Sequence, residues 1–186
     1  MVIDTKELNG FKVEIKNGCD ANDNPRDWDN LGTMVLFHKR YDVVNETSLD
    51  HKDYKGWGEL RSAITKTYGP SLIIPVYMYD HSGIALNTTG FECPWDSGQL
   101  GYIFITHSFI CSEYGRKRVS KRLLDMISSF LNEEVKIYSQ YINGEVYGYV
   151  ISKDDEVVDS CFGFYGSDFD SNGLNDEINT IISRQR

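Results

Sequence analysis

Residues 71–91 read SLIIPVYMYDHSGIALNTTGF and contain the clearest pair of strands in the chain. A β-rich run at 71–80 is followed by the tight turn His81-Ser82-Gly83, and residues 84–91 return as a second arm. Pro75 lacks a backbone donor, so its place in the first arm indicates an edge strand or a bulge. The stretch predicts a β-hairpin, and we expect the fold to be built from such pairs.

The same patterns continue on both sides of this hairpin. Strands are predicted at 11–16, 32–41 and 101–106, with a second hairpin at 144–166. Helices are predicted at 56–69, 120–142 and 174–182. The long helix has one apolar stripe, formed by Leu123, Leu124, Ile127, Phe130, Leu131, Val135 and Tyr138.

This order of elements predicts an α+β fold. We expect a mainly antiparallel sheet built from hairpins, with one long and two or three short helices packed on it. No repeat or low-complexity linker interrupts the chain, so residues 1–186 are expected to form a single domain.

The composition is that of a globular protein, with 40% hydrophobic and 25% charged residues. No apolar run approaches the ~20 residues that a membrane span needs, and no signal peptide is evident. The four cysteines include no C-x-x-C pair, which favours free thiols in a reducing compartment. We therefore expect a cytoplasmic protein with no membrane partner.

The charge is acidic and unevenly distributed. The chain has 19 Lys and Arg against 28 Asp and Glu, a net charge of −9. Residues 116–122, RKRVSKR, hold five of these cations and no acid, so the remainder carries −14. Such a surface repels phosphate, so it disfavours nucleic-acid binding outside residues 116–122 and suits a cationic partner.

Two sets of residues are binding candidates on this basis. The acidic stretch at 20–30 contains Asp20, Asp23, Asp27 and Asp29, and Asp42, Glu46, Asp50 and Asp53 extend it. The acids can imitate phosphates to a basic groove, bind magnesium, or simply form solvated turns. The predicted binding residues are Asp27, Trp28, Asp29, Asp50 and Asp53, with Arg116, Lys117, Arg118, Lys121 and Arg122 for nucleic acid.

The stretch CPWDSGQ at 93–99 is the catalytic alternative. Cys93 would be a nucleophile, His81 its base and Asp96 the residue that orients the base. The structural alternative is a loop corner, in which Pro94 and Gly98 set the backbone and polar side chains cap free N–H groups.

Metal ligation is the third chemistry that the residues suggest. In DFDSNG at 168–173, three side chains fall at positions one, three and five of a calcium loop, but the glutamate expected at position twelve is absent. Zinc would need His107 and Cys111, with Cys93 as a third ligand. We expect no cofactor, and calcium is the metal candidate, with ligands Asp168, Asp170, Asn172 and Asp176.

Several motifs resemble an uncharacterised family carried by phages, plasmids and integrated elements of bacteria. The family's motif order is NPR-x-WDN-x-G, HSG, CPWDSGQ-x-G and DSC-W-GFYG, and residues 24–166 follow it with Phe162 in place of Trp. The resemblance implies a mobile-element accessory protein. Small acidic proteins of this kind often inhibit host defence, as anti-CRISPR or antirestriction proteins do.

The expected function is therefore inhibition of a host defence nuclease of the Cas9 type, a basic protein or ribonucleoprotein. The acidic surface would bind the nuclease and residues 116–122 would contact its nucleic acid. The alternatives are a Cys/His or metal-dependent hydrolase or nuclease-like enzyme, and a sensor that binds a small nucleotide where the turn motifs meet.

Overall fold

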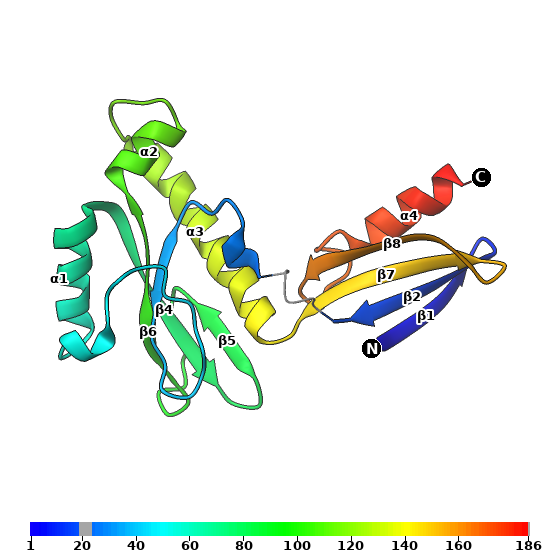
Figure 1. Ribbon diagram of the computed structural model, residues 1–186, viewed down its shortest axis with the longest axis horizontal. Coiled ribbons are helices and arrows are strands. Elements are labelled where there is room, and N and C mark those ends of the chain that lie inside the picture. The colour runs from blue at the N-terminus through cyan, green and yellow to red at the C-terminus, as the bar shows by residue number, and fades with distance from the viewer. Residues whose placement is uncertain (19–23, 186) are drawn as a thin grey trace. The chain divides into compact units, whose positions relative to one another are not determined.

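The computed structural model describes residues 1–18 and 24–185, and the chain divides into two units (Figure 1). Unit 1 comprises residues 1–25 and 140–186, and unit 2 comprises residues 26–139. Each unit has its own four-stranded antiparallel sheet and its own hydrophobic core. The expectation of one domain over residues 1–186 stays a prediction.

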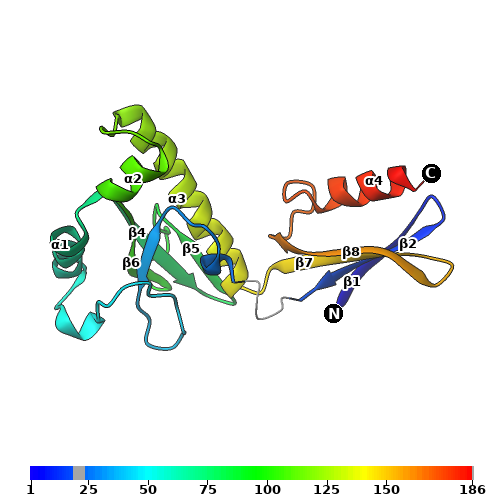
Figure 2. The same cartoon turned by 45° about the horizontal axis from the view of Figure 1, so that its top comes forward.

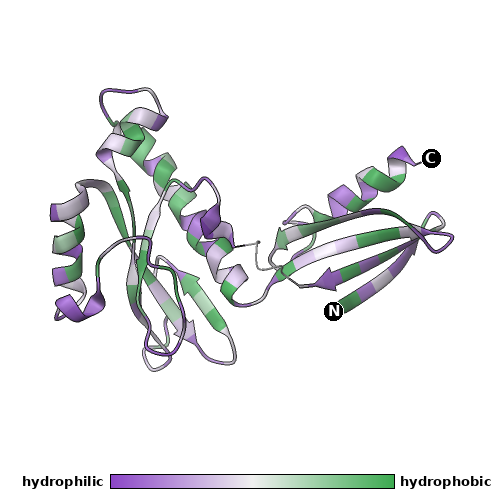
Figure 3. Ribbon diagram, viewed as in Figure 1, coloured by the Kyte–Doolittle hydropathy of each residue, from purple (hydrophilic) through white to green (hydrophobic). Residues whose placement is uncertain are grey.

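Unit 1 is a sheet with one helix on it. The strands β1 (Val2–Leu8), β2 (Phe11–Asn17), β7 (Val146–Lys153) and β8 (Glu156–Tyr165) lie in the order β1-β2-β7-β8. Helix α4 (Leu174–Arg184) covers one face, and Figure 3 shows its hydrophobic and hydrophilic sides. The core between them is formed by Phe11, Val13, Ile15, Tyr149, Ile151, Leu174, Ile178 and Ile182.

Strand β1 was not predicted from the sequence. It pairs with β2 through the two-residue turn Asn9-Gly10, in which both residues have positive φ. Asn-Gly is the preferred sequence for this turn because both residues tolerate the left-handed region. The Asn9-Gly10 pair could therefore have predicted a hairpin at 2–17 from the sequence.

Unit 2 has a sheet between two helices. The strands β3 (Thr33–Leu36), β6 (Ser97–Thr106), β4 (Pro70–Asp80) and β5 (Ile84–Asn87) lie in the order β3-β6-β4-β5. Helix α1 (Trp57–Tyr68) lies on one face and α3 (Lys121–Ile142) on the other, as Figures 1 and 2 show. The short elements are η1 (Pro25–Asp27), η2 (His51–Asp53) and α2 (His107–Glu113).

The hairpin at 71–91 is confirmed as β4 and β5. Strand β4 pairs with β6 along most of its length, but β5 pairs only with Tyr77–Asp80. Pro75 thus lies where β4 is the edge of the sheet, and the register shifts between Val76 and Tyr77. As a whole β4 is an inner strand, but Pro75 lies in the part that β5 does not cover, just before the register shift.

Most of the stripe on α3 is confirmed, since five of its seven residues are buried and Leu124 is half-buried. Leu123, Ile127, Leu131, Val135 and Tyr138 are buried, whereas Phe130 is 46% exposed. The helical spacing predicted that Phe130 belongs to the stripe. The sheet covers a narrower face of the helix than this spacing indicated, so Phe130 stays exposed. The helix also holds its neighbours by polar contacts, since Ser139 accepts from Leu86 N at 2.7 Å and Tyr138 from Val44 N at 2.9 Å.

The stretch NPRDWDNLG forms its main contacts through a buried arginine. Arg26 donates from Nε and Nη2 to the two oxygens of Glu46 at 2.9 and 3.0 Å, and from Nη1 to Glu134 at 2.9 Å. Its remaining donors bind Asn30 Oδ1 at 3.0 Å and Gly32 O at 2.6 Å. All five N–H donors of the guanidinium are thereby used. We call Arg26, Glu46 and Glu134 the Arg26 clamp.

The two carboxylates of the Arg26 clamp also hold backbone amides. Glu134 accepts from Leu31 N at 2.8 Å, and Glu46 accepts from Met34 N at 2.5 Å. Burial lowers the pKa of Arg26, but the bonds and charges of Glu46 and Glu134 outweigh it and raise the pKa above its ordinary value. The clamp therefore joins helix α3, the start of β3 and the segment after β3 around one permanent charge.

The last glycine of CPWDSGQLG is explained by packing. Gly101 lies in β6 opposite Leu36, and a Cβ atom there would meet Val35 O at 1.9 Å. Only glycine permits this approach of β3 to β6.

The α+β fold is confirmed, with four helices and eight antiparallel strands in the described residues. The expectation of one sheet differs from the structure, which has two. Strand pairing was predictable locally, but the assignment of hairpins to sheets depends on contacts between segments far apart in the chain, such as β2 with β7.

Two neighbouring residues of α3 test the Arg26 clamp. Glu134→Ala leaves Arg26 buried without one of its partners, and we expect a loss of about 3–5 kcal/mol in the free energy of unfolding. Glu133 forms only an exposed pair with Lys136, so Glu133→Ala should cost less than about 1 kcal/mol. Urea unfolding of the two variants measures the difference, and equal losses would contradict the clamp.

Candidate functional site

Unit 2 contains a cleft of about 990 Å³. It is lined mainly by the segment from Leu36 to Leu60, which runs from the end of β3 through η2 into α1, with Gln99 from β6. Its volume lies at the upper end of the range typical of small-molecule sites, about 300–1,000 Å³. We call this cavity the 36–60 cleft.

The segment that forms the 36–60 cleft is fixed by its own hydrogen bonds. Leu36 N donates to Val44 O at 3.0 Å, and Glu46 N donates to Met34 O at 2.9 Å, so the segment folds back onto β3. Further along, Asn45 accepts from Thr47 at 3.0 and 2.8 Å and donates to Leu49 O at 2.8 Å. The cleft is therefore preformed and does not depend on a ligand to order its wall.

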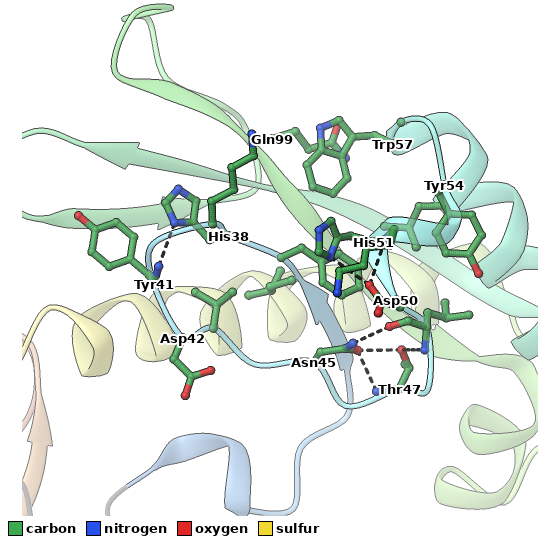
Figure 4. A pocket seen from close by; sticks show the side chains of 18 of the residues that line it. His38, Tyr41, Asp42, Asn45, Thr47, Asp50, His51, Tyr54, Trp57 and Gln99 are labelled. Carbon is green, nitrogen blue, oxygen red and sulfur yellow. Dashed lines mark hydrogen bonds and ion pairs between the residues drawn. The ribbon is translucent and has the colours of Figure 1, made fainter.

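Aromatic side chains form much of the wall of the 36–60 cleft. Phe37, Tyr54 and Trp57 pack against the core of unit 2 but stay half-exposed on their other side. Figure 4 shows His38 and Tyr41 at one end of the cleft and Trp57, His51 and Tyr54 at the other. Both ends thus present rings to the cavity.

The hydrogen bonds of His38 determine its tautomer. Its Nδ1 atom accepts from Arg40 N and Tyr41 N, both at 3.2 Å, so the proton of the neutral ring resides on Nε2. The ring stacks on Tyr41, with centroids 4.8 Å apart. Burial lowers the pKa of His38 below its ordinary value, and Arg40 adds to this while Asp80 opposes it. At neutral pH, His38 therefore presents an uncharged N–H donor.

Several charged groups of the 36–60 cleft already have partners. Arg40 pairs with Asp80, which also accepts from Tyr41 OH at 3.0 Å, and this bond, followed by burial, raises the pKa of Tyr41. His51 pairs with Asp50 at 3.1 Å. Lys39 and Lys52 are exposed, and neither forms an ion pair with any residue that the structure describes.

A smaller polar cavity of about 260 Å³ shares His38, Arg40 and Gln99 with the 36–60 cleft. Its other residues include Asp80, Trp95 and Asp96, so CPWDSGQ forms part of its wall. The indole of Trp95 is 93% exposed.

The three residues of the catalytic alternative lie close together, but Asp96 and not His81 contacts the thiol. Asp96 Oδ2 lies 3.6 Å from Cys93 Sγ and 3.4 Å from His81 Nδ1. The thiol therefore faces the carboxylate, whereas a thiol nucleophile needs the imidazole beside it. No hydrogen bond joins Cys93 to His81 in the part of the chain that the structure describes. Catalysis by these residues stays a prediction.

The motifs around Cys93 and His81 meet as a structural corner. Asp80 N donates to Asp96 O at 2.8 Å, and Ser97 donates to Cys93 O at 2.5 Å. HSG and CPWDSGQ thus lie side by side in unit 2, while the third motif, DSCFGFYG, lies in β8 of unit 1. The corner forms part of the wall of the smaller polar cavity.

The predicted acidic binding residues are exposed. Asp27, Trp28 and Asp29 lie in and after η1, with Trp28 50% exposed. Asp50 caps η2 by accepting from Lys52 N at 3.0 Å, and Asp53 ends it. Glu46 differs from the others because it is held in the Arg26 clamp. Asp20 and Asp23 lie outside the described residues.

The two units differ sharply in charge. Unit 1 has 6 Lys and Arg against 14 Asp and Glu, a net charge of −8. Unit 2 has 13 against 14, a net charge of −1. The acidic character that the sequence shows as a whole is thus concentrated in unit 1, although most of the predicted acidic binding residues lie in unit 2.

The cations of residues 116–122 are all exposed. Arg116, Lys117 and Arg118 follow α2, and Lys121 and Arg122 begin α3. Within the described residues, none of the five forms an ion pair. Ser120 Oγ accepts from Leu123 N at 3.3 Å, so a side-chain cap stabilises the helix start despite its unfavourable charge.

The predicted calcium ligands are occupied by bonds within their own loop. Asp168 Oδ1 accepts from Asp170 N and Ser171 N at 3.2 Å. The hydroxyl of Ser171, followed by these two backbone bonds, lowers the pKa of Asp168. Asn172 accepts from Leu174 N at 3.0 Å, and Asp176 lies in the first turn of α4. In residues 1–18 and 24–185, no group of three His, Cys, Asp or Glu could hold a metal ion.

The zinc alternative correctly placed two residues on one helix face. His107 and Cys111 both lie in α2, with Nε2 and Sγ 3.5 Å apart, and His107 Nδ1 contacts Ser71 Oγ at 3.1 Å. Cys93, Cys111 and Cys161 are free thiols, as expected.

Comparisons with models of protein families, with curated proteins and with solved structures found no match to this chain. The resemblance to a mobile-element family therefore stays a prediction. None of the helices in the described residues is both long and apolar enough for a membrane span.

Sequence reasoning missed the 36–60 cleft. Residues 42–56 were expected to be a polar loop, and His38 was expected to extend a strand that ends at Leu36. The available signal was the number of aromatic and histidine residues in and beside that polar segment, namely Phe37, His38, Tyr41, His51, Tyr54 and Trp57.

The state of His38 can be measured directly. We expect long-range ¹H–¹⁵N spectra at pH 7 to show a neutral ring with its proton on Nε2, titrating below a histidine in unfolded peptide. Because the folded pKa is lowered, His38 contributes stability that is present above the unfolded pKa and is lost as pH falls through the folded pKa. A proton on Nδ1 at pH 7, or a midpoint at the unfolded value, would contradict the hydrogen bonding described.

Proposed function

We propose that the protein acts by binding, and that unit 1 presents carboxylates to a basic, nucleic-acid-handling protein. The observation that carries this proposal is the charge of unit 1, −8 of the total of −9. An acidic surface of this size attracts a cationic groove by long-range forces and occupies the place of nucleic-acid phosphates.

One end of the unit 1 sheet is the favoured contact. The β1–β2 turn and the β7–β8 turn lie at the same end, as the strand register and Figure 1 show. Glu7, Asp154, Asp155 and Glu156 are exposed there. We call these four residues the acidic turn end.

The lysines of unit 1 leave the acidic turn end largely uncompensated. Lys6 pairs with Asp4, and Lys12 and Lys16 both pair with Glu14. Lys153 lies over the ring of Phe11 at 5.1 Å. No ion pair in the described residues involves a carboxylate of the acidic turn end. Arginines and lysines of a partner could therefore bind them without displacing internal pairs.

The resemblance to mobile-element proteins supports a host defence nuclease as the partner, and a Cas9-type ribonucleoprotein is the specific expectation. The cations of residues 116–122, which form no ion pair with any described residue, would contact guide RNA or DNA in such a complex. The acids and cations would then bind different components of one target. Such an inhibitor needs no turnover, so no catalytic residue is required.

The test is cleavage of a plasmid by a purified Cas9–guide RNA complex with and without an excess of this protein. We expect slower cleavage, and binding that weakens as salt rises from about 50 to about 200 mM. Unchanged cleavage at excess protein would refute the nuclease target, and salt-independent binding would refute the electrostatic mode.

Two variants locate the contact. Neutralising the acidic turn end with Glu7→Gln, Asp154→Asn, Asp155→Asn and Glu156→Gln should weaken binding about tenfold or more, and asparagine preserves the positive φ at 154 and 155. The comparison variant neutralises Asp27, Asp29, Asp50 and Asp53 in unit 2 and should bind within about twofold of wild type. If instead only the second variant weakened binding, the contact would lie on Asp27, Asp29, Asp50 and Asp53, as the sequence predicted.

A further inference from the structure

We propose that the 36–60 cleft is a binding site for a nucleotide, with the base between the aromatic side chains and the phosphate on the exposed lysines. This site is separate from the acidic turn end and does not depend on the function proposed above. It requires only residues of unit 2.

The aromatic composition of the cleft favours a planar ligand. Trp57 and Phe37 are half-exposed although they pack on the core, and the Phe37 and His51 rings lie 5.5 Å apart at 43°. Stacking of a flat ligand on partly exposed rings is energetically favourable because it removes their apolar faces from water. A nucleobase offers such a flat face. The volume of about 990 Å³ accommodates a nucleotide with space for water.

The charges of the cleft favour an anion, which is unusual in a chain of net charge −9. The lining holds three cations, Lys39, Arg40 and Lys52, against the two carboxylates Asp42 and Asp50. Of these, Arg40 is paired with Asp80. Lys39 and Lys52 remain exposed among the lining residues, without an ion pair to any described residue. Figure 4 shows Asp42 pointing away from the aromatic rings. The two lysines are therefore the groups of the cleft that can bind a phosphate without breaking an internal ion pair.

Two polar side chains can read the edge of a base. His38 has its Nδ1 lone pair occupied by backbone amides, so Nε2–H is the donor that it can offer a ligand. Gln99 donates from Nε2 to Gly101 O at 3.2 Å, which fixes the amide and leaves its oxygen as an acceptor. One donor and one acceptor on the cleft wall match the mixed edge of a nucleobase.

The experiment is a titration of the ¹⁵N-labelled protein with AMP, GMP, CMP and UMP, followed by ¹H–¹⁵N spectra. We expect the indole N–H of Trp57 and the side-chain amide of Gln99 to shift saturably with at least one nucleotide, at a dissociation constant below about 1 mM. The indole of Trp28, which does not line the cleft, should stay unchanged in the same spectra. No saturable shift with any of the four would overturn the proposal.

Two further comparisons test whether base and phosphate are recognised together and whether the lysines bind the phosphate. Ribose 5-phosphate and the free nucleoside should each bind at least about tenfold more weakly than the nucleotide, and equal binding of either would refute joint recognition of base and phosphate. Lys39→Glu with Lys52→Glu should weaken nucleotide binding about tenfold or more, because the phosphate would meet like charge. Arg61→Glu with Lys66→Glu, exposed residues of α1 outside the cleft, should leave it unchanged, and equal loss in both variants would contradict the assigned phosphate contact.

Discussion

The buried charge of Arg26 is the constraint on which unit 2 depends. A guanidinium cannot lose its proton, so its burial requires that every donor be bonded, and Glu46 and Glu134 supply most of the acceptors. Glu134 comes from α3, and Glu46 lies in the segment that returns along β3. The Arg26 clamp therefore sets both the start of β3 and the base of the wall that forms the 36–60 cleft.

This constraint changes how the sequence motifs are interpreted. NPRDWDNLG holds the scaffold through Arg26, HSG and CPWDSGQ form a corner through Asp80, Asp96 and Cys93, and Gly101 permits β3 to approach β6. These roles are structural. Most groups that remain available for partners lie in the acidic turn end, in residues 116–122 and in the 36–60 cleft, to which the motifs contribute Gln99. This distribution suits a protein that functions by binding.

Local patterns predicted the elements well, because strand alternation and helical spacing depend on neighbouring residues. The hairpin at 71–91 and the long helix follow from such patterns, and the Asn9-Gly10 turn could have shown β1. The clamp could not be predicted, since Glu46 and Glu134 lie 20 and 108 residues from Arg26. The charge difference between the units was hidden for the same reason, because unit 1 joins the two ends of the chain.

Native-state hydrogen exchange of the amides bound by the Arg26 clamp tests this account most directly. Leu31 N and Met34 N donate to side-chain carboxylates and not to a neighbouring strand. If the clamp organises unit 2, they should exchange only through global unfolding, as slowly as amides of the central strand β6. Exchange as fast as that of Thr47 N or Lys52 N, which are bonded only within the exposed loop, would contradict it.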